Sequence, residues 1–129
     1  MKNVFSLFLF LVLTSGIHAQ QKQVVTVKIN TPTVQGQPCK ERLEQFLKYE
    51  EGVARVIVDF RKKITTITYH TERTNIENLK TAIANQGFDA DDIKANPESY
   101  NKLPTACKKP EDRPENKVLK NTKAVKKDN

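Results

Sequence analysis

The 129-residue sequence has no tryptophan, one methionine, and only two residues each of cysteine and histidine. The methionine is Met1, and His70 is the only histidine beyond residue 18. A chain that has lost its N-terminal segment therefore has no methionine thioether to bind a metal. Cys39 and Cys107 are too far apart to form a Cys-x-x-Cys redox motif, and the sequence shows no phosphate-binding glycine loop or catalytic triad. We predict that the chain is not an enzyme.

Long apolar runs are also missing, since none reaches the roughly twenty residues needed to cross a membrane. The longest, Val4 to Leu13, is interrupted only by Ser6; it follows Lys2 and precedes the small residue Ala19. This is the pattern of a cleaved signal peptide over residues 1–19. We expect an exported protein, periplasmic or secreted, whose mature chain does not span the membrane. Disulfides persist in such compartments.

The net charge of +7 is concentrated near the C-terminus. Residues 108–129 carry eight basic and four acidic side chains. No aromatic residues alternate with these lysines to stack on bases, so nucleic-acid binding is not expected. The composition predicts a largely disordered basic tail over 110–129.

Apolar periodicity between residues 22 and 96 predicts one folded domain. The predicted elements are strands near 24–29, 53–60 and 64–70, helices near 39–49 and 75–86, and a last edge strand over 88–95. Thr74 and Glu77 have the spacing of a capping box at the start of the second helix. The order predicts an α+β, ferredoxin-like βαββαβ sandwich, followed by a cysteine-bearing extension over 97–109.

Several of these residues reproduce a familiar spacing. Cys39 starts a helix, Leu43-Glu44 follows, Gly52-Val53 ends the helix, and residues 83–90 finish with Gly-Phe-Asp-Ala. Over roughly 24–95 the chain resembles the heavy-metal-associated domain family. That family holds a soft ion such as Cu(I), Zn(II) or Hg(II) on a Met-x-Cys-x-x-Cys motif. Aligned on Cys39, the first cysteine falls on Gly36 and the methionine on Val34, so the resemblance implies a degenerate motif.

The first functional hypothesis is therefore an exported metal-binding or metal-transfer module. Thiolates prefer soft ions, and a helix N-terminus favours the thiolate form of Cys39. Cys107 is the candidate second metal ligand, because the extension is long enough to fold back over a small domain. A partner's thiolate is the other option, and a metal-transporting membrane protein is the candidate partner.

The alternative is a metal-free interaction module in which Cys39 and Cys107 form a structural disulfide. His70 is expected to be a solvated residue at a strand end. The cluster of Asp89, Asp91 and Asp92 lacks a calcium-binding loop and is expected to keep an edge strand soluble.

Overall fold

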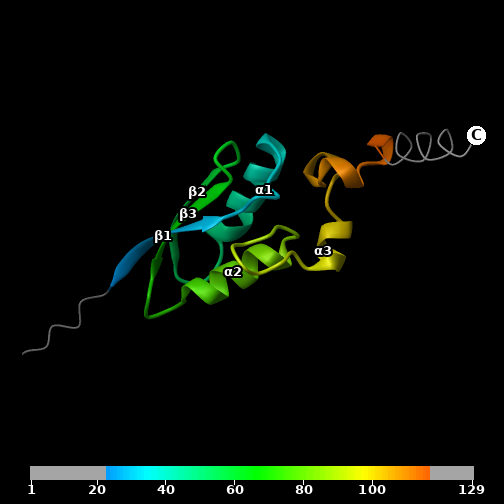
Figure 1. The fold of residues 1–129 in the computed structure, drawn as a ribbon. Coiled ribbons are helices and arrows are strands. Elements are labelled where there is room, and N and C mark those ends of the chain that lie inside the picture. Colours follow the sequence, from blue (N-terminus) through cyan, green and yellow to red (C-terminus); the bar gives the residue numbers. More distant parts are fainter. Residues whose placement is uncertain (1–22, 117–129) are drawn as a thin grey trace, which may run out of the picture.

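The computed structural model describes residues 23–116 (Figure 1). The predicted signal peptide, residues 1–19, lies outside the described residues. The main elements are β1 (Val24–Asn30), α1 (Gln37–Lys48), β2 (Val53–Asp59), β3 (Ile64–His70), α2 (Ile76–Asn85) and α3 (Pro97–Asn101). Two 3₁₀ turns follow, η1 (Thr105–Cys107) and η2 (Pro110–Asp112). No helix in this part of the chain is long and apolar enough to cross a membrane.

The sheet has the strand order β1-β3-β2, with both outer strands antiparallel to β3. Alternate strand residues point toward the helices, as the period of two requires. Apolar side chains from the sheet, from α1 and from α2 share one core. Its fully buried members include Ile29, Leu43, Leu47, Ile67 and Ile83. This is the predicted α+β, ferredoxin-like arrangement of two helices on one face of an antiparallel sheet.

The start of α1 is set by local chemistry. Pro38 occupies the first turn, where a missing backbone N–H costs nothing. Leu43 and Leu47 then recur one turn apart and are fully buried. At the other end Gly52 adopts φ +79°, a conformation that glycine takes without strain, and redirects the chain into β2. The predicted order of helix and strand is confirmed here.

The predicted fourth strand over 88–95 is wrong. These residues form a tight turn closed by a bridge between Ala90 and Ile93, with Asp91 at φ +50°. The Asp91 side chain accepts the backbone N–H of Asn30, and the Asp91 N–H donates to the Asn30 carbonyl. This contact touches only the last residue of β1. Acidic residues have low strand propensity, and Asp tolerates the left-handed conformation that ends pairing.

The predicted capping box at Thr74 and Glu77 is also wrong. Helix α2 starts one residue later, with Asn75 as its N-cap, and the Asn75 side chain accepts the N–H of Asn78. Asn and Thr are both favoured N-caps, so the spacing alone could not decide between neighbouring residues.

Lys80 of α2 ties this helix to the turn that replaces the fourth strand. Its ammonium lies 3.0 Å from Asp92 and 3.2 Å from Glu77. The hydrogen bond from Lys80 lowers the pKa of Asp92, and the same bonds to Asp92 and Glu77 raise the pKa of Lys80. Asp92 therefore anchors this turn on the helix, and the acidic cluster lies in a turn and not in an edge strand as predicted.

Replacing Lys80 by methionine should raise the pKa of Asp92 toward its ordinary value of 3.8, measured by NMR titration. A carboxyl with a lowered folded pKa stabilises the protein above its unfolded pKa, and this contribution is lost as the pH falls through the folded value. The stability difference between variant and wild type should therefore shrink below about pH 4. Asp59 is the control. Backbone N–H groups of its own turn lower its pKa, so the Lys80 substitution should leave the pKa of Asp59 unchanged.

The segment after α2 folds back onto the domain. Leu103 is 4% exposed and joins the core, and the Asn96 N–H donates to the carbonyl of Ala84. Of the predicted tail over 110–129, the described part holds η2, while 117–129 lies outside the described residues. The predicted boundaries of the extension and tail stay predictions.

Gly87 makes this docking possible. It has φ +90°, and a Cβ there would lie 3.0 Å from the backbone N and Cα of Tyr100.

Gly87→Ala should therefore lower the free energy of unfolding by about 2 kcal/mol, because the alanine would be strained in the left-handed conformation and its Cβ would displace α3. Urea denaturation measures this. Gly36→Ser is the matched control, with room for a side chain and an expected change within about 0.5 kcal/mol. Equal effects would mean that Gly87 has no special role.

Candidate thiol site

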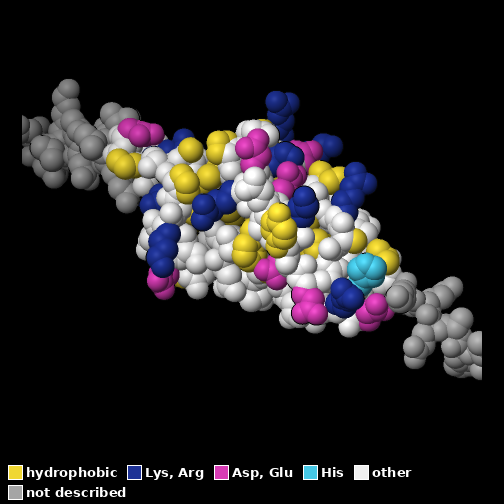
Figure 2. Space-filling model, turned by 180° about the vertical axis from the view of Figure 1, so that it is seen from behind, with side chains coloured by type: hydrophobic (Ala, Val, Ile, Leu, Met, Phe, Trp, Pro, Cys, Tyr) yellow, Lys and Arg dark blue, Asp and Glu magenta, His cyan; other side chains and the backbone are white. Residues whose placement is uncertain are grey.

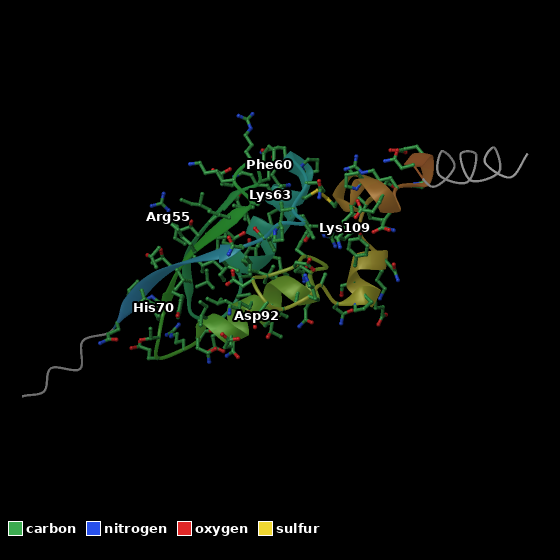
Figure 3. All side chains as sticks on the ribbon, viewed as in Figure 1. Arg55, Phe60, Lys63, His70, Asp92 and Lys109 are labelled. Atoms are coloured by element: carbon green, nitrogen blue, oxygen red, sulfur yellow. A yellow bond between two sulfur atoms is a disulfide. The ribbon has the colours of Figure 1, made fainter. Side chains whose placement is uncertain are left out.

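The two cysteines meet at the first turn of α1. Their Cα atoms are 5.5 Å apart and their sulfurs are bonded in a disulfide, although 68 residues separate them in sequence. Figure 3 shows this bond in yellow between α1 and the C-terminal segment. Cys39 is 0% exposed and Cys107 is 1% exposed. The structure thus brings the two sequence-predicted ligands together, in the oxidised form.

The loop between β1 and α1 is held firmly beside this bond. Thr31 donates its N–H to the carbonyl of Lys63, and its hydroxyl hydrogen-bonds that of Thr65 at 2.9 Å. The Lys63 ammonium donates to the carbonyl of Val34 at 2.6 Å. Val34, the position aligned with the family's methionine, is fully buried. Lys63 was not identified as part of the site from the sequence, where it is one of three consecutive basic residues.

Gly36 stands at the open end of this loop, as the N-cap of α1. Its φ of −169° is ordinary extended backbone, and a Cβ at this position would have Pro38 Cδ as its nearest neighbour, 3.9 Å away. Space therefore exists where the family's first cysteine would project. The sequence supplies no thiol there.

The C-terminal segment covers Cys39 from the other side. The Arg113 guanidinium donates to the carbonyls of Ala106 and Lys108, on both sides of Cys107. The sulfur of Cys39 lies 3.8 Å from the Ala106 oxygen, a contact without a hydrogen bond because a disulfide sulfur carries no proton. Arg113 was not identified from the sequence either, because it lies in a charged stretch that was predicted to be disordered.

Tyr100 links α3 to the residues beyond the disulfide. Its hydroxyl donates to Asp112 at 2.7 Å and accepts the N–H of Lys109 at 2.9 Å. Burial, followed by the bond to the Asp112 carboxylate, raises the pKa of Tyr100. The residues beyond the disulfide therefore keep contacts with α3 that do not depend on the two sulfurs.

The other candidate ligands lie elsewhere. His70 ends β3 and is drawn at the far end of the sheet from Lys63 and Lys109 in Figure 3. Asp89 accepts the N–H of Ala95 at 2.8 Å and faces Lys94 at 3.6 Å. Within residues 23–116 no group of three or more His, Cys, Asp or Glu side chains is arranged to hold a metal ion.

A βαββα sandwich with a cysteine at the tip of its first helix resembles the heavy-metal-associated type of domain. No family model matches the sequence. The chain is 27% identical over 88 residues to the mercuric transport protein periplasmic component of Shewanella putrefaciens, a match covering 68% of this chain and 93% of that protein.

One solved structure supports the fold, and a second gives a lower TM-score. Oxidized MerP from Ralstonia metallidurans CH34 superposes with a TM-score of 0.51 at 23% identity, over 54% of this chain and 96% of that one. The mercury-bound form of MerP, the periplasmic protein of the bacterial mercury detoxification system, gives a TM-score of 0.48 at 25% identity, over 54% of this chain and 96% of that one. The described domain therefore shares the fold of oxidized MerP, and with the 27% identical relative this confirms the resemblance stated from the sequence.

Proposed function

We propose that this protein is an exported soft-metal module whose ion site consists of the Cys39 and Cys107 thiolates in the reduced state. The observation that carries the proposal is that the fold brings these two distant sulfurs together at the tip of α1. A helix N-terminus favours thiolates, and thiolates favour soft ions. The apolar run after Lys2 and the periplasmic relative support export.

The ligand number narrows the choice of ion. Zinc in proteins takes four ligands. Residues 23–116 offer no group of three or more ligating side chains, and two thiolates satisfy only an ion that accepts two-coordinate geometry. Cu(I) and Hg(II) fit this requirement, whereas Zn(II) would need ligands from a partner. The relative's name, a mercuric transport component, supports a cargo of this class.

Reduction must precede binding. An external dithiol supplies two electrons and two protons, breaks the S–S bond, and leaves as its own disulfide. Two thiols remain on this chain, and an entering Cu(I) or Hg(II) ion displaces their two protons. A metal-transporting membrane protein with its own thiolates is the proposed recipient, because thiolates can exchange a soft ion through a shared intermediate.

A second candidate function is a metal-free interaction module with a structural disulfide. One specific observation favours it: both sulfurs are bonded to each other and almost completely buried. In that case the domain would keep the scaffold of its relatives without their ion chemistry.

An anaerobic titration separates the two candidates. Fully reduced protein should bind one equivalent of Cu(I) or Hg(II), whereas the oxidised protein should bind none at the cysteines. Cys107→Ser should weaken binding by at least about a hundredfold, because the second ligand no longer acts intramolecularly. Cys39→Ser should do the same.

The decisive comparison is with the variant lacking both cysteines. If reduced wild type binds no more tightly than that variant, the metal proposal is wrong and the disulfide module remains. Competition against a chromophoric Cu(I) chelator gives the affinities, and thiol titration before each run confirms the redox state.

A further inference from the structure

The turn that replaces the fourth strand leaves one long edge of the sheet unpaired. In β1, only Asn30 meets that turn, through Asp91. The exposed positions of β1 include Val24, which is 49% exposed, while Val25 and Val27 are half-buried. An exposed edge of β-branched residues is a template for another strand.

The hydrogen-bond pattern shows which backbone groups are available. Asn30 directs both its N–H and its C=O away from β3, toward Asp91. Gln23 directs its carbonyl toward β3, where it accepts the N–H of Thr71. Because these directions alternate along an antiparallel strand, Val24, Thr26 and Lys28 present their N–H and C=O groups outward. None of these six groups has a partner within residues 23–116.

The opposite edge of the sheet is protected. In β2 the N–H of Val58 points outward and donates to the Glu44 carboxylate of α1 at 2.7 Å. A register shift between Val53 and Arg55 also interrupts that strand. Side-chain caps and bulges are the usual means of blocking edge pairing. The β1 edge has neither between Val24 and Lys28.

We propose that the β1 edge is a self-association surface, on which a second copy of this chain pairs antiparallel about a two-fold axis through Thr26. In this register Thr26 faces Thr26 of the second copy, and Val24 faces Lys28 of the second copy. All six outward backbone groups are then bonded. The same three residues serve both copies, as an isologous interface requires.

The side chains fit this register. On the helix side, Val25 lies beside Val27 of the second copy, so two half-buried apolar pairs are covered. On the sheet face away from the helices, Lys28 is the only charged residue of the paired segment. It faces Val24 of the second copy, so no like charges lie opposite each other. Figure 2 shows apolar side chains in small groups with Lys and Arg between them on the face that it presents, and no broad apolar patch there. The face drawn there therefore offers little apolar surface for face-to-face stacking.

The inference is independent of the proposed metal chemistry and is tested on the intact oxidised protein. Three residue pairs make a small interface, so a dimer is expected at about 0.1–1 mM, measured by sedimentation equilibrium. Hydrogen exchange should then slow at the amides of Val24, Thr26 and Lys28 as the concentration rises. The amides of Val25 and Val27 bond β3 in monomer and dimer alike and should not change.

Thr26→Lys places like charges opposite each other at the two-fold axis and should weaken association about fivefold or more. Ile57→Lys is the control, on the protected edge strand, and should change association by less than about twofold. A monomer at 1 mM, or amide protection that does not depend on concentration, would overturn the proposal. Loss of the dimer in Ile57→Lys but not in Thr26→Lys would place the contact on the sheet face and also overturn it.

Discussion

Replacing Cys39 and Cys107 together by alanine should lower the free energy of unfolding by about 4 kcal/mol. The bond closes a loop across a separation of 68 residues, and the chain-entropy model assigns a value of this size to such a loop. Small domains are stable by only about 5–15 kcal/mol, so the loss is a large fraction of the total. Alanine is chosen because both sulfurs are buried and serine would add hydroxyl groups without partners.

Urea denaturation of the oxidised wild type and the double variant measures this difference. Reduced wild type is the second comparison, and it should match the double variant within about 1 kcal/mol because both lack the closed loop. An unfolding midpoint that is the same with and without the bond would show that the disulfide contributes nothing to stability and that noncovalent contacts such as those of Leu103 hold the extension.

Gly36→Cys, made in a Cys107→Ala background, should create a high-affinity site for Cu(I). The position is extended, open, and three residues before Cys39 at the tip of α1. Two thiolates on one rigid tip bind as a chelate, so the affinity should exceed that of Cys107→Ala by about 10²–10⁴-fold. An anaerobic competition assay against a Cu(I) chelator measures the gain.

Gly36→Ser in the same background is the control, because it adds a hydroxyl at the same position and should give no gain. If the introduced cysteine also gives none, the loop around Val34 and Lys63 does not allow both sulfurs to approach one ion. The scaffold would then have lost more than a single ligand.

The sequence was sufficient for the elements that local patterns define. Alternation located the three strands, and the recurrence of Leu43 and Leu47 located α1. The last strand was predicted from its place in the expected order, against its weak propensity, and that prediction failed. Asp91 adopts a left-handed conformation and bonds the end of β1, an outcome that depends on Asn30, about sixty residues earlier.

The site was predicted in part. The sequence identified Cys39 and Cys107 but left open whether they would meet as a disulfide or as a metal site, because their contact is set by how the extension folds back. Lys63 and Arg113 act by donating to backbone carbonyls. Such roles leave no periodic pattern in a sequence, since any carbonyl can accept the bond.

Two cysteines allow only one intramolecular pairing. Cys39 precedes Cys107 along the chain, so if the chain is exported from its N-terminus, as proposed above, Cys39 emerges with no intramolecular partner until most of the domain has followed. The native bond can then form in a single oxidation. A chain of this kind needs an oxidant but no isomerase, and its one wrong product is a bond between two molecules.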